Sequence, residues 1–294
     1  MALVTPESYW ASFAGSLFLC LVFQIYHFSV ESENRRKTEA TAATTTTSTT
    51  VILEDPRLKD FKAFQSNYLF VYLLAMLADW LQGPYIYELY VFYGFKEVEI
   101  AELFVCGFGS SMIAGTFVGS LADKYGRKTM CVVYCICYIG ACFTKLVPNY
   151  GVLMLGRFLS GISTSLLFSV FESWMICEHK SRSYSEAALA ETFAYATLGN
   201  GLMGVIGGLL ANSVATHYGF VAPFILAIVP LVIVMMTVIF TWTNNYGANQ
   251  QGSQSSMFAS LKGGCEFIKS NSRIAALGMA QSLFEGSMYT FVLM

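Results

Sequence analysis

The sequence predicts an all-α protein that crosses a membrane several times. Hydrophobic residues make up 55% of its 294 residues and charged residues only 12%, about half the charged share of an ordinary soluble domain. Eight apolar stretches approach the roughly 20 residues that a helix needs to cross the hydrocarbon core of a bilayer. These stretches cover residues 9–28, 68–90, 100–122, 129–147, 151–177, 192–214, 220–242 and 274–294.

The composition also argues against several soluble classes of protein. A net charge of -2 does not suggest a nucleic-acid partner. Four of the eight cysteines lie in the single apolar run 131–142 without paired CxxC spacing, so we expect them to pack in a core and not to bind a metal or form disulfides. There is no P-loop, strand-associated GxGxxG or HExxH motif. We therefore expect no enzyme activity, no metal and no cofactor.

The first apolar stretch is expected to form an extra N-terminal helix, residues 1–30. No Lys or Arg precedes Tyr9, and Glu7 is acidic, whereas a secretory signal begins with a basic region. This favours a retained helix with its N-terminus outside the cell over the alternative of a cleaved signal peptide. Residues 31–67 form a basic, threonine-rich linker, which we expect to be disordered because it has too little apolar surface to bury.

The loops predict how the chain is oriented in the membrane. If the linker 31–67 is cytoplasmic, the loops on its side hold fourteen Lys and Arg residues and the opposite loops hold two, Lys96 and Lys145. This distribution follows the positive-inside rule. Residues 68–242 would then form six helices, 243–273 a cytoplasmic loop, and 274–294 a seventh helix.

The loop between the third and fourth stretches has the most specific pattern, Gly-Ser-Leu-Ala-Asp-Lys-Tyr-Gly-Arg-Lys over 119–128. Gly119 allows another helix to approach closely, and Gly126 supports a tight turn. Asp123 can pair with Arg127 or meet the positive end of a neighbouring helix, while Arg127 and Lys128 stay at the cytoplasmic surface. The pattern resembles the signature between the second and third core helices of major facilitator transporters.

Further phrases support this resemblance. Arg157-x-x-x-Gly161 is similar to an element of the fourth core helix in that superfamily. Residues 78–85, 168–174 and 281–285 resemble segments of the eukaryotic molybdate-anion transporters, and the likeness runs from about residue 64 to residue 294.

The resemblance implies a major facilitator-type helical bundle: the N-terminal six-helix half, one extra N-terminal helix and the start of the second half. It also implies uptake of molybdate across the cell membrane. A full member has twelve core helices, so we expect either a truncated sequence or a short form.

Ionisable residues inside the apolar stretches are the candidate functional residues, because each costs roughly 2.5–3.5 kcal/mol at the bilayer centre. The candidates for substrate binding or coupling are Asp79, Gln82, Tyr85, Arg157 and Glu285. Asp79 is near mid-helix and Gln82 is one turn further on, where Gly83 and Pro84 can loosen the helix. Gln82 and Glu285 occupy matching positions in the two halves, although this three-residue match can also arise by chance.

With Lys145 counted in a loop, Arg157 is the single cation within a span, which makes it a natural partner for an oxyanion. A structural pair with a carboxylate on another helix is an equally weighted alternative. Three carboxylates against one arginine is an unusual balance for binding a dianion, and a co-transported proton would reconcile the two as a hypothesis.

A cytoplasmic gate is expected around the signature loop. Glu172 lies fifteen residues after Arg157, roughly 22 Å along a helix, which places it near that loop. The expected gate residues are Gly119, Asp123, Gly126, Arg127, Lys128 and Glu172. Two other functions remain open: a transporter of the same fold for a sugar, a drug or another anion, and a multi-helix receptor or scaffold, which would leave the signature loop unexplained.

Overall fold

The computed structural model describes residues 56–247, 263, 266 and 268–292. Side chains are described within 59–247 and at 263, 266 and 268–283. The extra helix expected at 1–30, most of the linker 31–67 and much of the loop 243–273 therefore lie outside the described residues.

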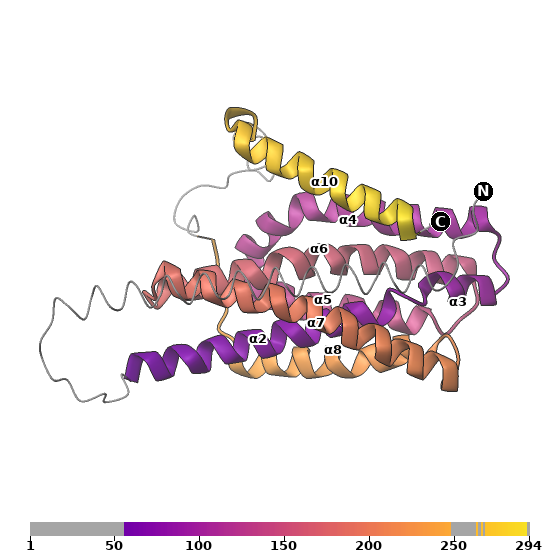
Figure 1. The fold of residues 1–294 in the computed structure, drawn as a ribbon, viewed down its shortest axis with the longest axis horizontal. Coiled ribbons are helices and arrows are strands. Elements are labelled where there is room, and N and C mark those ends of the chain that lie inside the picture. The colour runs from indigo at the N-terminus through magenta and orange to yellow at the C-terminus, as the bar shows by residue number, and fades with distance from the viewer. Residues whose placement is uncertain (1–55, 248–262, 264–265, 267, 293–294) are drawn as a thin grey trace, which may run out of the picture. The chain divides into compact units, whose positions relative to one another are not determined.

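The described residues form helices joined by turns and contain no strand, as Figure 1 shows. The helices are α2 Pro56–Gln82, α3 Ile86–Phe92, α4 Glu97–Tyr125, α5 Arg127–Thr144, α6 Tyr150–Ser181, α7 Glu186–Tyr218, α8 Ala222–Thr241 and α10 Ser272–Val292. This confirms the all-α fold class.

Five helical stretches among the described residues are long and apolar enough to cross a membrane. They are Lys59–Phe92, Glu97–Tyr125, Tyr150–Ser181, Glu186–Tyr218 and Ala222–Thr241. Helix α5 is not in this set, because Arg127 and Lys128 in its first turn lower the hydropathy of a short helix. Large apolar side chains also cover the outside of the bundle, including Met112, 71% exposed, and Leu209, 68% exposed. Such a surface suits a hydrocarbon environment and not water.

The structure divides the apolar stretch 68–90 into two helices. Helix α2 ends at Gln82, and α3 begins at Ile86 after a turn. Pro84 lies in this turn, where its missing N–H and its ring interrupt the helical hydrogen-bond ladder. The sequence expectation that Gly83 and Pro84 loosen this helix agrees with the break.

Turn chemistry explains where the next helices begin. Gly126 joins α4 to α5 with φ 91°, a conformation that glycine adopts without a steric penalty. Asn149 caps α6 by accepting a hydrogen bond from the Val152 N–H at 3.2 Å. Ser185 caps α7 in the same way through the Ala188 N–H at 3.3 Å. These side chains satisfy backbone donors that the first turn of a helix leaves unpaired.

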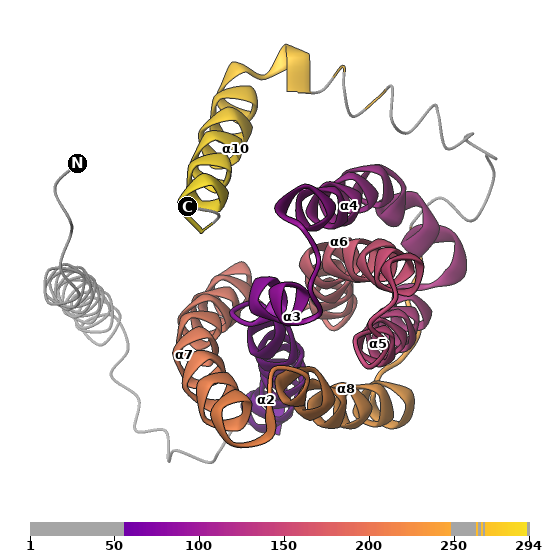
Figure 2. The same ribbon diagram turned by 90° about the vertical axis from the view of Figure 1, so that its right-hand side faces the viewer.

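Helix α6 packs most extensively on α4 and α5, and α5 also packs on α8; Figure 2 looks along these helices. Small residues allow the α4–α6 approach. The Ser111 and Ser165 hydroxyls lie 3.0 Å apart, and a side chain at Gly161 would collide with Ser110 and the Gly107 carbonyl. Close packing of this kind is characteristic of helices in membranes.

Polar bonds attach α2 to its neighbours. Gln65 Nε2 donates to Thr192 Oγ1 on α7 at 2.9 Å, and Trp80 Nε1 donates to Asn200 Oδ1 on the same helix at 2.8 Å. Tyr134 of α5 donates to the Ala75 carbonyl at 3.3 Å. Helix α2 therefore lies between α5 and α7.

The bundle has two ends. The signature end is where α4 turns into α5, and the opposite end contains α3 and the turn from α5 into α6. A large apolar cluster runs through the bundle from the signature end. A smaller cluster at the opposite end is formed by Ile86, Leu89, Tyr90, Ile100, Leu103, Leu153 and Phe224.

Candidate functional site

Asp79 of α2 faces α5. The Tyr138 hydroxyl donates a 2.5 Å hydrogen bond to Asp79 Oδ1, and no ion pair to Asp79 occurs among the described side chains. A carboxyl group that depends on one hydroxyl within a membrane bundle is costly to ionise. Asp79 thus has the surroundings of a group that can hold a proton.

Gln82 and Tyr85 make contacts that do not involve Arg157. Gln82 is buried, and its Nε2 donates to the Ala78 carbonyl of its own helix at 3.1 Å. The Tyr85 hydroxyl donates to Asn212 Oδ1 on α7 at 2.8 Å, and its ring stacks on Phe220. The side chain of Glu285 lies outside the described residues, so the suggested pairing of Gln82 with Glu285 stays a prediction.

Arg157 lies on α6 near the opposite end and is half-buried. Its Nε donates to the Leu103 carbonyl of α4 at 3.2 Å, and its guanidinium lies 4.6 Å from the centre of the Phe104 ring. A Cβ atom at Gly107 would come within 2.9 Å of Arg157 Nη2, so this glycine makes room for the guanidinium. No carboxylate within the described part of the chain forms an ion pair with Arg157.

Lys145 is a buried lysine that sequence reasoning missed. It follows the last residue of α5 and is 1% exposed, although the charge count placed it in an external loop. Its Nζ lies 3.4 Å from the Tyr90 hydroxyl, and the Tyr93 hydroxyl donates to its backbone carbonyl at 2.6 Å. The available sequence signal is that Lys145 lies between the apolar helix α5 and the apolar pair Leu146 and Val147.

At the signature end, the expected pairing of Asp123 with Arg127 is present. Arg127 Nη2 lies 2.6 Å from Asp123 Oδ1. The Arg127 backbone N–H donates to the Asn245 carbonyl at 2.9 Å, and its Nη1 donates to the Tyr246 carbonyl at 3.4 Å. Lys128 Nζ donates to the Ile239 carbonyl at 2.8 Å. The signature residues therefore bind the end of α8 and the chain that follows it.

The other expected gate residues are placed as follows. A side chain at Gly126 would collide with Asn244, so the glycine allows the segment after α8 to approach. Gly119 has no atom within 4 Å of the position a Cβ would take. Glu172 is partly buried and forms no ion pair with Asp123 or Arg127 within the described residues.

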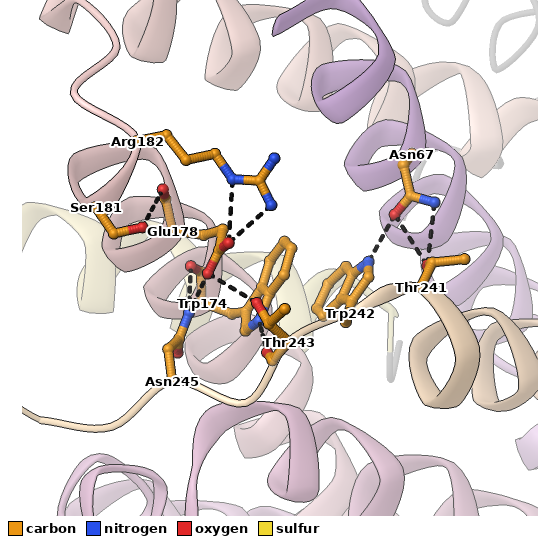
Figure 3. A network of polar contacts seen from close by, with 9 residues as sticks. All are labelled: Asn67, Trp174, Glu178, Ser181, Arg182, Thr241, Trp242, Thr243 and Asn245. Atoms are coloured by element: carbon orange, nitrogen blue, oxygen red, sulfur yellow. Dashed lines mark hydrogen bonds and ion pairs between the residues drawn. The ribbon is translucent and has the colours of Figure 1, made fainter. Parts of the chain in front are cut away.

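Glu178, six residues after Glu172, is the carboxylate that connects α6 to the segment after α8 at the signature end. Figure 3 shows its contacts. Its Oε1 accepts hydrogen bonds from Arg182 Nη2 at 2.8 Å and Nε at 3.1 Å. Its Oε2 accepts from Thr243 Oγ1 at 3.0 Å and from Asn245 Nδ2 at 3.5 Å. One buried carboxylate thus bonds both to its own helix and to the segment after α8.

Two tryptophans complete this attachment, as Figure 3 also shows. The rings of Trp174 and Trp242 stack with centroids 3.6 Å apart. Trp174 Nε1 donates to the Thr243 carbonyl at 2.8 Å, and Trp242 Nε1 donates to Asn67 Oδ1 of α2 at 2.8 Å. Residues 242–247, which we call the strap, are therefore bonded to α2, α5 and α6. A hollow of about 440 Å³ beside the strap is lined by Arg127, Ser173, Ile176, Cys177 and Tyr246.

Membrane-length helices packed through small residues, with ionisable groups inside the bundle and a basic turn at one end, define a multi-pass membrane protein of the transporter class. The chain belongs to the major facilitator family MFS_5, described as sugar transporters with 12 transmembrane segments, whose model matches residues 39–294. This confirms the resemblance noted in the signature loop.

Relatives of known name give a narrower comparison. The molybdate-anion transporter of Takifugu rubripes is 37% identical over 254 residues, covering 79% of this chain and 53% of the relative. That of Xenopus laevis is 39% identical over 236 residues, covering 79% and 51%. The chain thus spans about half the length of these relatives. A solved peptide transporter is similar at 17% identity with a TM-score of 0.43, covering 76% of this chain and 44% of that one.

Proposed function

We propose that the full-length protein is a secondary transporter that takes up molybdate, a tetrahedral dianion, across the cell membrane. The relatives named molybdate-anion transporters support this substrate, since they are 37% and 39% identical over 79% of the chain. The observation that carries the proposal is Arg157, a half-buried guanidinium without a carboxylate partner among the described residues. A planar guanidinium fork suits an oxyanion.

The test is isotopic molybdate uptake by cells that lack other molybdate carriers. Tungstate has the same shape and charge and should compete, whereas the smaller sulfate should compete less. Arg157→Lys keeps the charge but loses the fork and should weaken uptake, and Arg157→Gln should nearly abolish it. Uptake equal to that of vector controls, with the protein verified at the cell surface, would reject the substrate.

Sugar transport is the second candidate, because the description of the matching family names sugar transporters. The same cells distinguish the two candidates. Inhibition of molybdate uptake by tungstate but not by an excess of neutral hexoses supports the anion, whereas uptake of a labelled hexose without uptake of molybdate supports a sugar.

Asp79 is proposed to carry a co-transported proton. Its single described hydrogen-bond partner is Tyr138, and a carboxyl group in such surroundings can alternate between neutral and charged forms. Asp79→Asn should therefore preserve anion exchange while uphill accumulation and its pH dependence are lost. A variant that still accumulates molybdate with an unchanged pH profile would remove this assignment.

The topology and the gate belong to the same proposal. The N-terminus and the opposite end face outward, and the linker 31–67, the loop 243–273 and the signature end face the cytoplasm. Residues 1–30 add a helix before the six-helix half 68–242, and 274–294 begin the second half. The ion pair of Asp123 with Arg127 and the bonds of the strap support a cytoplasmic gate in which contacts at this end form in one state of the cycle and separate in the other. Glu172 is the remaining member proposed for this gate.

A further inference from the structure

We infer that Lys145 and Arg157 together form a dianion-binding site at the opposite end of the bundle, with one cation for each charge of the anion. The inference rests on the proposed anion transport and adds a second binding residue, Lys145, at a defined place between α3, α5 and α6. Tyr90, whose hydroxyl lies 3.4 Å from Lys145 Nζ, is the third member of the site.

Three helices bring these residues together. Lys145 Nζ lies 3.4 Å from the Tyr90 hydroxyl of α3, and a Cβ atom at Gly156 of α6 would lie 3.2 Å from the same Nζ. Gly156 directly precedes Arg157 in the sequence. The Arg157 guanidinium lies 4.6 Å from the centre of the Phe104 ring, and the centre of that ring lies 6.3 Å from the centre of the Tyr90 ring. The two cations and the hydroxyl therefore border one small region.

Glycines leave room for the two basic side chains. A side chain at Gly156 would collide with Thr144 and approach the Lys145 ammonium, and one at Gly107 would press on the Arg157 guanidinium. Gly156 of α6 thus faces Lys145, which follows α5, and Gly107 of α4 faces Arg157 of α6. The two basic side chains therefore occupy space that a larger residue at Gly156 or Gly107 would take.

The charges in this region are not balanced by protein carboxylates. Within the described residues neither Lys145 nor Arg157 forms an ion pair. Glu102, an exposed carboxylate on α4, accepts a 2.5 Å hydrogen bond from Tyr150 instead. Asp79, eleven residues before Tyr90 in the chain, bonds to Tyr138.

Burying a cation without a counter-charge is costly, and buried charges in proteins are normally paired. Lys145 is 1% exposed and has a single side-chain hydrogen bond, to Tyr90. Arg157 uses one of its five donors, Nε, in a described hydrogen bond. A bound oxyanion would supply the missing negative charge and accept the unused donors of both side chains. Two positive charges match a dianion better than a monoanion of the same shape.

The experiment uses the full-length protein, purified in detergent, with uptake measured in parallel. Thermal unfolding is followed at increasing molybdate concentration, because an anion that binds the folded state raises the unfolding temperature. Perrhenate serves as a tetrahedral monoanion of similar size. The variants are Lys145→Met, which keeps the length of the side chain without its charge, and Lys145→Gln as a polar second variant. Lys96→Gln is the matched control, since Lys96 is the other lysine assigned to this side and is exposed.

Lys145→Met should unfold at the same or a higher temperature than wild type without anion, because an uncompensated buried charge has been removed. Its KM for molybdate should rise roughly 10- to 100-fold, the loss expected for one charge-assisted hydrogen bond. Its preference for molybdate over perrhenate should fall, whereas Lys96→Gln should match wild type in all three measurements.

The outcomes separate this site from the general proposal. Wild type that neither takes up molybdate nor gains stability from it rejects the proposed function and this site with it. Molybdate uptake by wild type with an unchanged KM and anion preference in Lys145→Met or Lys145→Gln rejects the site alone. Loss of folded protein in both variants also rejects it, because the charge would then support the fold and not a ligand.

Discussion

Replacement of Glu178 by glutamine is expected to loosen the strap at the signature end. Glu178 accepts hydrogen bonds from Arg182, Thr243 and Asn245, and its side chain is 11% exposed. Glutamine has nearly the same volume, but it is neutral and its NH2 group cannot accept a bond. When its remaining oxygen stays with the Arg182 guanidinium, the glutamine turns its NH2 group toward Asn245 Nδ2, a second donor, and the Thr243 hydroxyl loses its present acceptor.

The expected loss of unfolding free energy follows from how deeply each hydrogen-bond partner of Glu178 is buried. A hydrogen bond to a charged, buried group contributes about 1.5–3 kcal/mol, so Glu178→Gln should cost about 2 kcal/mol of unfolding free energy. Arg182 is an ion-pair partner whose side chain is 41% exposed, and solvent screening reduces its share to below about 1 kcal/mol. Most of the loss should come from the bonds of Glu178 to the strap and little from Arg182.

Thermal unfolding of variants in detergent tests whether the bonds to the strap contribute more than Arg182. Glu178→Gln should lower the midpoint by roughly 4–8 °C, Arg182→Gln by less than half of that, and Thr243→Val by an intermediate amount. Asp60→Asn, an exposed carboxylate of α2, is the control and should change the midpoint little. If Arg182→Gln destabilises as much as Glu178→Gln, or if Glu178→Gln equals Asp60→Asn, the reasoning about the strap is wrong.

Three further predictions concern the topology, the gate and the proposed proton carrier. Single cysteines at Thr46 and Ser183 in a cysteine-free background should react with a permeant reagent only, because the distribution of Lys and Arg places both in the cytoplasm. Arg127→Ala should lower transport several-fold at normal membrane insertion, because it removes the 2.6 Å pair with Asp123 and the bond to the strap. Tyr138→Phe should shift the pH dependence of uptake to higher pH, because Asp79 loses the donor that stabilises its charged form.

Each of these predictions has a comparison within the chain. Labelling of either cysteine by an impermeant reagent in intact cells would contradict the topology. Lys124→Ala removes an exposed cation three residues before Arg127 and should transport normally, so equal kinetics in the two variants would remove the gate assignment. Tyr87→Phe changes a tyrosine that is 40% exposed, and a pH profile for Tyr138→Phe that matches this control would separate Tyr138 from coupling.

Much of the architecture could be predicted from the sequence, because membrane helices leave local signals. The length of each apolar stretch is set by the thickness of the bilayer, so the helices α4, α6, α7 and α8 lie where hydropathy places them. The turn at Gly126 and the pair of Asp123 with Arg127 could likewise be predicted, since all three residues lie within five positions of one another. The break at Pro84 follows from the chemistry of a single residue.

The candidate site was less predictable, because burial depends on residues far away in the sequence. Asp79 and Arg157 were found as ionisable residues in apolar stretches, but their partners Tyr138 and Leu103 are 59 and 54 positions away. Nothing local to Asp79 indicates Tyr138. The sequence also placed Gln82 one turn after Asp79, but it did not indicate that Gln82 donates to the Ala78 carbonyl of its own helix.

Glu178 and Lys145 show most clearly what tertiary structure decided. The sequence determined the class of the protein, the helices and their expected orientation, because these depend on hydropathy, charge and short motifs. It placed Lys145 in a loop and drew attention to Glu172 over Glu178. Only the folded bundle brings Tyr90 and Gly156 around Lys145 and packs the strap against Glu178. The environment of a charge is a property of all the helices around it, and a single helix does not encode it.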